Sequence, residues 1–385
     1  MPANFHHLPF KMVGCKVSGG KKLKSFSIFV DLKNPQRRRM QGANWQKNMK
    51  LKEFAEKVGL SPTTVSRALG GYPEVREETR QRVMQAALKY GYLPNANAVR
   101  LATGRAGAIG VVMGRSGGGH FFSEFMGGMA TRLEREETDI LVSVTVDNNL
   151  DEELAIFSRL AASGRVDGII VHSPRPEDER IALLNRLGVP FIVHGRSKTP
   201  FEHAWLDIDN HDVTYRPTIH FLERGHRRIA LINGPVGRTF VRDREQGFRE
   251  ALATHGITPD PRFMMNEHFS EETAFRFARS LLEQTPRPTA FVAGAMMTAQ
   301  GVYRAATQMG LTIGKDVSVI AHDDVFPYLT PESMMPPLST TRSPMRMAGI
   351  RVTDLLLQII GGRPVREVQE LWPVELILRE SVGPA

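Results

Sequence analysis

Three short segments with helical periodicity follow Met49. In KLKEFAEKVG the apolar residues fall at positions i, i+3, i+4 and i+7, which is one face of a helix: Leu51, Phe54, Ala55 and Val58. Gly59 can end this helix, and Ser61 followed by Pro62 is a typical start for the next one, SPTTVSRAL. A third helix is predicted in ETRQRVMQAALKYGY, where three residues face the first two helices: Val83, Ala87 and Tyr90. The short, glycine-containing turn between the first two helices indicates a helix-turn-helix.

The second of these helices has an apolar side and a polar side. Its outward residues are short hydroxyls and one cation: Thr63, Thr64, Ser66 and Arg67. Hydroxyl groups suit phosphates and base edges, and arginine can bind guanine through two hydrogen bonds. Residues 49–107 hold ten basic and five acidic residues, a net charge of +5, which favours binding to nucleic acid. The alternative for this stretch alone is an ordinary solvated helical hairpin.

From Ala108 onward, apolar runs of strand length alternate with segments of helical periodicity. The predicted strands are continuously apolar, as expected for strands buried on both faces of a parallel sheet: AIGVVM, DILVSVTV, VDGIIVHS, PFIVHGR, RRIALING, TAFVAGA and VSVIAHDD. The helices predicted between them include FFSEFMGGMATRLERE, LDEELAIFSRLAASG, DREQGFREALATHG, EETAFRFARSLLEQ and MTAQGVYRAATQMG. Pro217 lacks an N–H, so we expect it to kink or restart its helix. This alternation predicts an α/β domain that binds ligands beyond the carboxyl ends of its strands.

Composition and charge narrow the class of protein. The chain has 385 residues, 41% of them hydrophobic and 24% charged, which suits two or three globular domains and neither wholesale disorder nor a membrane bundle. The chain has a formal net charge of +9. Residues 1–48 alone carry this charge, because they contain ten basic residues and one acidic residue, Asp31, whereas the charges of residues 49–385 sum to zero. Three interpretations of this segment are an inert basic arm, an organelle transit peptide, and sequence upstream of a natural start at Met49; we favour the first and the last. We expect its removal to leave DNA sequence preference unchanged.

The cysteine content and the start of the chain predict a cytoplasmic protein. Cys15 is the only cysteine, so no intramolecular disulfide can form, which fits a reducing compartment. The apolar run from Phe26 to Val30 is shorter than the ~7 to 15 residues of a secretory h-region. We expect no membrane partner.

From Met49 to its end the chain resembles the lactose and galactose repressor family of bacterial transcription regulators. The resemblance rests on KLKEFAEKVGLSPTTVSRAL and VREETRQRVMQAALKYGYLPNANAVRLATGRAGAIGVV, in which a helix-turn-helix, a third helix, Tyr-x-Pro-Asn and a hinge follow in fixed order. The resemblance implies that a leader at 1–48 is followed by a helix-turn-helix DNA-binding domain at 49–95 and a hinge at 96–107. It implies a two-lobed effector-binding and dimerisation domain at 108–385, with parallel sheets like those of periplasmic sugar-binding proteins. The expected partner of the homodimer is a near-palindromic operator in double-stranded DNA.

The same resemblance assigns DNA contacts residue by residue. Pro62, Thr63 and Arg67 would face base edges, while Thr64, Ser66 and Asn95 would lie against phosphates. Leu101 would be an apolar wedge inserted into the minor groove. The alternative interpretation is that Leu101 is a leucine of the linker that contacts no partner. The full set of expected DNA-binding residues is Leu51, Ser61, Pro62, Thr63, Thr64, Ser66, Arg67, Asn95, Ala98 and Leu101.

Two departures from the family pattern lie in this region. Val99 and Arg100 stand where an Arg-Ser or Gln-Gln pair is more common. Arg76 replaces a small hydroxyl residue at the start of the third helix, which costs ~1 kcal/mol of helix capping. Neither change removes the predicted function.

By resemblance the effector site lies in loops that follow strands. The expected residues are His120, Phe121, Arg196, Arg238, Arg244, Phe269, Met296 and Asp323. Arginine and carboxylate groups bond adjacent hydroxyls and an aromatic ring covers an apolar sugar face, so the expected effector is a sugar. Many members carry Asn-Asp where this chain has Ala295 and Met296, so the usual sugar-binding carboxylate is absent there. The motifs HGR, WLDIDN and DREQGF resemble those of regulators of oligosaccharide or glucoside uptake.

Two other functional classes compete with this prediction. A transport-type sugar-binding protein would need export and no helix-turn-helix. The segment GRSGG around Ser116 matches the G-x-S-x-G turn of hydrolases, but no oxyanion motif precedes it. Asp323 and Asp324 are adjacent carboxylates without further ligands, so we expect neither a metal nor another cofactor. The sequence therefore predicts a repressor and not an enzyme. Effector binding is expected to alter the pairing of the hinges in the dimer and so the affinity for the operator. The sequence leaves open whether the effector is an inducer or a corepressor.

Overall fold

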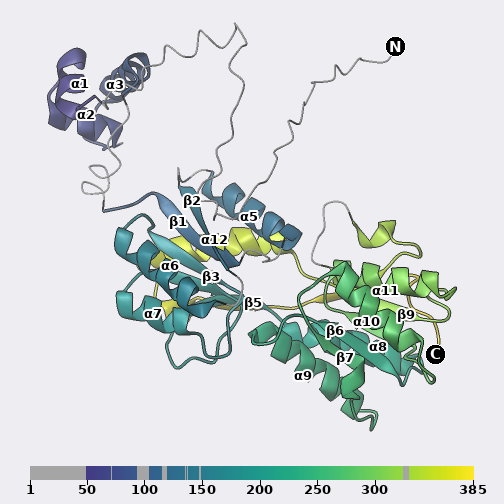
Figure 1. Ribbon diagram of the computed structural model, residues 1–385. Coiled ribbons are helices and arrows are strands. Elements are labelled where there is room, and N and C mark those ends of the chain that lie inside the picture. The colour runs from purple at the N-terminus through teal and green to yellow at the C-terminus, as the bar shows by residue number, and fades with distance from the viewer. Residues whose placement is uncertain are drawn as a thin grey trace, which may run out of the picture. The chain divides into compact units, whose positions relative to one another are not determined.

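The computed structural model describes residues 49–70, 72–92, 104–114, 119–134, 136, 138–146, 149–323 and 329–385. The backbone of Gly119 to Phe121 is included, without their side chains. By their contacts the residues form two compact units, which divide between Asn95 and Ala96. We describe each unit by itself (Figure 1).

The first unit contains the helices α1 (Leu51–Val58), α2 (Pro62–Leu69) and α3 (Glu77–Tyr90). Their bounds match the predicted helices, and Gly59 ends α1 in the left-handed conformation with φ 70°. Arg76 precedes α3 without a side-chain cap, as its residue type predicts. The helix-turn-helix expected from periodicity is therefore present.

The core of this unit corrects one prediction. Phe54, Val65 and Val83 are fully buried, and the ring of Phe54 stacks on Tyr92 with 4.1 Å between centroids. Tyr90, which the periodicity assigned to the core, is exposed, and the Lys57 ammonium lies 5.2 Å from its ring centroid. Gly91 adopts φ 61°, so the chain leaves the helix there and the next aromatic residue, Tyr92, turns inward.

The second unit consists of two lobes, each built on a six-stranded sheet. The first sheet has the order β11-β5-β4-β3-β1-β2, with β1 (Ala108–Gly114), β2 (Asp139–Thr145), β3 (Gly168–His172), β4 (Phe191–His194), β5 (Ala204–Ile208) and β11 (Gln369–Trp372). The second has the order β12-β10-β9-β8-β6-β7, with β6 (Ile229–Asn233), β7 (Met264–Asn266), β8 (Ala290–Ala293), β9 (Ser318–Asp323), β10 (Ser339–Arg342) and β12 (Glu375–Ile377). All these pairings are parallel except that of β10 with β12. The fold class is therefore α/β with parallel sheets, as predicted.

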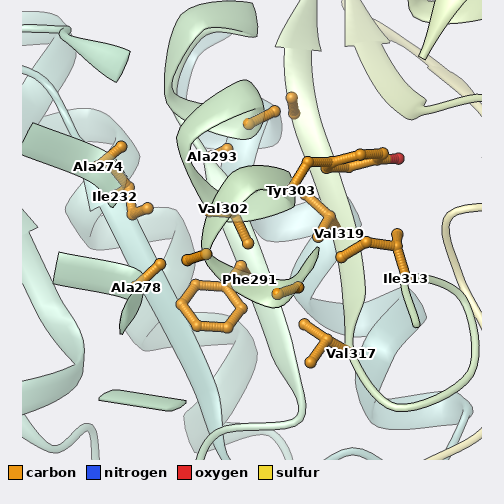
Figure 2. Packing of buried hydrophobic residues seen from close by; sticks show 14 of the residues in the cluster. Ile232, Ala274, Ala278, Phe291, Ala293, Val302, Tyr303, Ile313, Val317 and Val319 are labelled. Carbon is orange, nitrogen blue, oxygen red and sulfur yellow. The ribbon is translucent and has the colours of Figure 1, made fainter. Parts of the chain in front are cut away.

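Helices cover both faces of each sheet. In the first lobe, α5 (Gly119–Leu133) and α12 (Met345–Ile360) pack on one face, and α6 (Leu150–Ser163) and α7 (Glu179–Leu187) pack on the other. In the second lobe, α8 (Asn210–Glu223) and α9 (Thr239–Ala253) face α10 (Glu271–Leu282) and α11 (Met296–Gln308) across the sheet. Short 3-10 helices lie at Pro261–Phe263, Pro331–Ser333 and Val365–Glu367. Figure 2 shows the α10–α11 side of the second core, where Phe291 and Val302 are fully buried.

The chain passes between the lobes more than once, so the lobes are not consecutive halves of the sequence. It crosses after β5 and returns after β10, because α12 packs on the first sheet beside α5. It crosses again between β11 in the first sheet and β12 in the second. Connections of this kind place the carboxyl ends of strands from both lobes near the crossing segments, where ligands are bound in open α/β sheets.

Two local predictions are wrong, the second of them in part. The run DILVSVTV was expected to be buried on both faces, but β2 is an edge strand, and Val142 and Val144 are 39% and 56% exposed. Pro217 was expected to kink or restart its helix; the helix does not restart, because α8 continues through this residue from Asn210 to Glu223. Thr218 donates its hydroxyl to the Thr214 carbonyl at 2.7 Å, so a side chain supplies a hydrogen bond within the turn that contains the proline.

Candidate functional site

The candidate DNA-binding surface is the exposed side of α2. Val65 and Ala68 of this helix are buried in the first unit's core, which turns Thr63, Ser66 and Arg67 to the opposite side, where all three are exposed. Because the helix is held by its inner face, the orientation of its outer side chains is set by packing. A hydroxyl and guanidinium surface on a rigid short helix can bind phosphates and base edges.

Ser61 and Thr64 are engaged with each other at the start of α2. The Ser61 hydroxyl oxygen accepts the Thr64 N–H at 3.0 Å, and the two hydroxyl oxygens lie 2.8 Å apart. Pro62 occupies the first helical position and is exposed. Ser61 is therefore first an N-cap, and only its remaining hydrogen-bonding capacity is open to a phosphate.

The other expected DNA contacts fall in different places. Leu51 is half-buried and packs against the core of the three helices, so it supports α1 more than it offers a surface. Asn95, Ala98 and Leu101 lie outside the described residues, as does most of the segment predicted to be a hinge.

Some of the basic residues in the first unit donate hydrogen bonds to backbone carbonyls of the same unit. Arg82 donates to the Val58 carbonyl at 2.5 Å at the end of α1. Arg80 donates to the Tyr72 carbonyl at 3.0 Å and pairs with Glu77 at 3.0 Å. The charge on the exposed side of α2 thus comes from Arg67, which the sequence singled out.

In the second unit, Arg244 is the most buried of the predicted effector-site cations. It lies on α9, only 5% exposed, and donates through Nε to Asn210 Oδ1 at 3.0 Å and through Nη1 to the Gly294 carbonyl at 2.9 Å. Its guanidinium carbon lies 5.0 Å from the ring centroid of Phe240. Arg244 therefore joins the start of α8 to the end of β8, at the edge where strands of this lobe terminate.

The ring of Phe269 lies against Gly234 and Gly294, where there is no side chain to exclude it. A Cβ at Gly294 would lie 2.8 Å from Phe269 Cε1, and a Cβ at Gly234 would lie 3.1 Å from Phe269 Cζ. The ring centroids of Phe269 and Phe240 are 6.4 Å apart. The carboxyl ends of β6 and β8 thus carry an aromatic surface next to an arginine, a combination suited to a sugar.

Arg238 connects the two lobes. Its Nη1 donates to the Ser173 carbonyl at 3.0 Å, and the N–H of the next residue, Thr239, donates to the Pro174 carbonyl at 3.0 Å. Burial lowers the pKa of Arg238, and the nearby cations Arg180 and Arg175 lower it further. Ser173 itself has φ 50°, which is uncommon for a residue other than glycine, so this strand end is held in a strained conformation.

The remaining predicted effector residues differ in burial and in whether the structure describes their side chains. Asp323 is buried at the end of β9 and pairs with Arg342, with 3.3 Å between Oδ2 and Nε. Met296 is the first residue of α11 and is fully buried in the apolar core of this lobe. His120 and Phe121 lie in the first turn of α5, and their side chains are outside the described residues.

The sequence reasoning missed a histidine pair at the ends of β3 and β4. His172 and His194 are register partners, their Nδ1 atoms lie 2.9 Å apart, and His194 stacks on Phe125 with 4.6 Å between centroids. Burial lowers the pKa of both rings, that of His194 to about 4, so at neutral pH one neutral ring donates to the other. The signal was available, since the predicted strands VDGIIVHS and PFIVHGR each carry a histidine directly after an apolar run.

Arg196 lies apart from Arg244 but is connected to it through two polar residues. Its Nε donates to Asp207 Oδ2 at 2.9 Å, and Asp207 Oδ1 accepts from the Asn210 amide at 3.1 Å. Burial raises the pKa of Asp207 to about 6, although the contact with Arg196 opposes this. Asn210 was not predicted, yet it contacts both Asp207 and Arg244.

Taken together, fold and sites define a two-lobed ligand-binding domain joined in one chain to a helix-turn-helix unit. A model of the bacterial regulatory proteins of the lacI family matches residues 50–95, and one of a periplasmic binding protein-like domain matches residues 218–382. The chain is 43% identical over 339 residues to the HTH-type transcriptional regulator AglR of Rhizobium meliloti (strain 1021), covering 87% of this chain and 94% of that protein. The chain belongs to the LacI family of bacterial transcription regulators. This agrees with the prediction of a regulator and not an enzyme.

Solved structures support the same assignment. A crystal structure of the lac repressor dimer bound to operator and the anti-inducer ONPF is similar with a TM-score of 0.77 at 28% identity, covering 88% of this chain and all of that one. The complex of the transcriptional regulator CelR with cellobiose is similar with a TM-score of 0.64 at 26% identity, covering 86% of this chain and 99% of that one. In the part of this chain that the structure describes, no helix combines the length and apolar content needed to cross a bilayer.

Proposed function

We propose that the protein is a dimeric, effector-controlled repressor that binds a near-palindromic operator through α2. The observation that carries the proposal is the exposed side of α2, where Thr63, Ser66 and Arg67 project from a helix held by buried Val65 and Ala68. The surrounding segment, residues 49–107, has a net charge of +5, whereas residues 108–385 hold 30 basic and 35 acidic residues. The positive charge is thus concentrated where phosphates would be bound.

The proposed domain organisation follows from the same features. Residues 49–95 bind DNA, residues 96–107 form a hinge and residues 108–385 bind the effector and dimerise. Cytoplasmic location follows from the proposed function.

Dimerisation through the first lobe is supported by its edge strand. Val142, Val144 and the following Val146 are 39%, 56% and 42% exposed; they alternate along the chain and so form an apolar row on one face of β2, the strand at the edge of the sheet. Such an edge is normally covered in a stable protein. The similar lac repressor structure is a dimer bound to operator, and two copies of one helix-turn-helix would occupy two half-sites.

The proposed effector is a sugar bound near the carboxyl ends of the strands of both lobes. Arg244, Arg238 and Phe269 supply hydrogen-bond donors and an aromatic face, and Asp323 supplies a carboxylate. Arg196 and Met296 are the other described residues that the resemblance assigns to the effector; Arg196 bonds to Asp207, and Met296 is fully buried in the apolar core. The similar CelR structure holds cellobiose, which makes oligosaccharides the first candidates.

Control would follow from the contacts between the lobes. Arg238 and Thr239 of the second lobe bond to carbonyls of Ser173 and Pro174 in the first. An effector that competes for these contacts changes the relative position of the lobes and, through the hinge, operator affinity; by linkage, operator binding changes effector affinity equally.

The decisive experiment is selection of bound DNA from a random pool, repeated with a panel of sugars that includes cellobiose. It yields the operator, the effector and the sign of control. Arg67→Ala is expected to lose specific binding, by about 1–3 kcal/mol for a base contact, and to retain sugar binding. Lys89→Ala removes one positive charge from α3 and serves as the control, with a small loss on all DNA sequences. Unchanged operator affinity in Arg67→Ala would overturn the assignment of α2.

A further inference from the structure

We propose that the second unit has an additional ligand site, for a small metabolite bearing a phosphate or carboxylate group, in a pocket between the loop after β4 and helices α8 and α9. The pocket has a volume of about 330 Å³, at the lower end of the range for small-molecule sites. Neither Arg244 nor Phe269 lines this pocket, although it includes Arg196, which the family resemblance assigned to the effector, and Thr239, which bonds to the first lobe; the inference rests on the proposed ligand-binding function of this unit.

The pocket is lined by both lobes. Arg196, Ser197 and Lys198 come from the loop after β4 in the first lobe. Thr239, Asp243 and Gln246 are spaced four and three residues apart, so they share one side of α9 in the second lobe. A ligand bound here would contact both lobes at once and would therefore respond to their relative position.

The charges lining the pocket favour an anion. Asp243 is the one carboxylate among the lining residues, and its contact with Arg196 is long at 3.5 Å; Arg196 pairs more closely with the buried Asp207, at 2.9 Å. Within the described residues, no carboxylate lies within ion-pair distance of the Lys198 ammonium. A phosphate or carboxylate could thus be bound by Lys198 and by the side of Arg196 that now faces Asp243.

His211 lines the second-lobe side of the pocket, and its ring is already paired with carboxylates. Burial lowers its pKa, but hydrogen bonds to Glu250 and Asp212 outweigh burial and raise the pKa overall. The His211 Nε2 atom lies 2.8 Å from Glu250 Oε2. The cationic groups of the pocket are therefore Arg196 and Lys198 of the first lobe, and Thr239 and Gln246 of the second lobe add neutral hydrogen-bonding groups that the same anion can reach.

A series of hydrogen bonds leads from the pocket to the proposed sugar site. Arg196 donates to Asp207, Asn210 donates to the other oxygen of Asp207 at 3.1 Å, and Arg244 donates to Asn210 at 3.0 Å. An anion bound on the Asp243 side of Arg196 pulls on the same guanidinium that donates to Asp207, and so acts on Asn210 through this carboxylate. Binding at the pocket is therefore expected to change sugar affinity, and the reverse by linkage.

The pocket is tested by isothermal titration calorimetry on the full-length protein, with inorganic phosphate and malonate as separate probes at constant ionic strength. We expect saturable binding of one probe or both, and the tighter one identifies phosphate or carboxylate as the group recognised. Lys198→Gln is expected to weaken binding by roughly tenfold, since it removes one charge-assisted contact. Lys315→Gln removes an exposed charge from the second lobe away from the pocket and should bind like the wild type.

Two outcomes would overturn the proposal: no saturable binding of either probe, or an equal loss in Lys198→Gln and Lys315→Gln. The titration requires neither DNA nor sugar, so its failure leaves the proposed repressor function standing. Gln246→Ala changes the α9 side of the pocket and gives an independent second variant if Lys198→Gln alters the loop.

Discussion

Arg244 and Asn210 form a buried hydrogen bond of 3.0 Å that joins α9 to the first residue of α8. Arg244 also donates to the Gly294 carbonyl at 2.9 Å, so one guanidinium holds three segments at the edge of the second sheet. Asn210 in turn donates to Asp207, the last but one residue of β5, where the chain leaves the first lobe. The proposed sugar site and the crossing between lobes therefore share one polar network.

Arg244→Lys is expected to weaken sugar binding by at least about tenfold and to spare operator binding in the absence of sugar. A lysine keeps the charge, but a single ammonium cannot reproduce the two directed bonds of the guanidinium. The measurement is a titration of labelled operator with the sugar that the panel identifies. Arg249→Lys is the control, because Arg249 lies on the same helix and is exposed, paired with Glu245. Equal sugar affinity in Arg244→Lys and wild type would contradict the assignment.

The packing of α5 against α12 leads to a prediction about two adjacent glycines. A Cβ at Gly128 would lie 2.0 Å from the Arg346 carbonyl oxygen, whereas a Cβ at Gly127 would meet only the end of the Arg346 side chain, at 3.0 Å. Gly128→Ala should lower the free energy of unfolding by about 2–3 kcal/mol, because backbone must move. Gly127→Ala should be neutral or stabilising by up to ~1 kcal/mol, since alanine favours the helix. Urea unfolding of the two variants measures both changes in the free energy of unfolding. Equal changes in Gly127→Ala and Gly128→Ala would contradict the close contact between Gly128 and the Arg346 carbonyl.

The histidine pair predicts a pH dependence of stability. The pKa of His194 is lowered to about 4 in the folded protein, against about 6.5 for an unfolded chain. The stabilising contribution of the neutral ring is fully present above pH 6.5 and is lost as the pH falls towards 4, because the unfolded chain then binds more protons. Asp207, with its pKa raised to about 6, contributes in the opposite direction: its stabilisation is lost as the pH rises through 6.

His194→Gln isolates the histidine part of this balance. The wild type should lose up to about 3 kcal/mol more than the variant between pH 7 and pH 4, and the Asp207 contribution cancels in the comparison. Urea unfolding at a series of pH values measures the difference. His255→Gln replaces an exposed histidine on the same chain and is the control. Parallel pH profiles for wild type and His194→Gln would show that the buried pair does not titrate with folding.

Local features of the sequence determined the helix-turn-helix and its exposed face. The spacing of Phe54 and Val58 places both on one side of α1, and Ser61 caps α2 through a contact three residues away. These interactions lie within one or two helical turns, so they can be inferred without knowing the fold. The same holds for the alternation of strands and helices after Ala108, which predicted the parallel α/β class.

Where a residue's role depends on a distant segment, the sequence pattern was insufficient. Tyr90 fits the helical spacing but is exposed, because the left-handed Gly91 turns Tyr92 onto Phe54. The apolar run of β2 is typical of a central strand, yet strand order places it at an edge. Met296 follows a strand like the other predicted effector residues, but its side chain packs under α11.

The sequence by itself thus determined the class of protein, the position of the helix-turn-helix and the residue types available for ligand binding. Only the tertiary structure decided which of those residues meet: Arg244 with Asn210, His172 with His194, and Arg196 with Gln246 around one pocket. The physical reason is that secondary structure depends on neighbours along the chain, whereas a ligand site depends on strand order and on crossings between lobes. These bring together side chains whose separation in sequence carries no periodic signal.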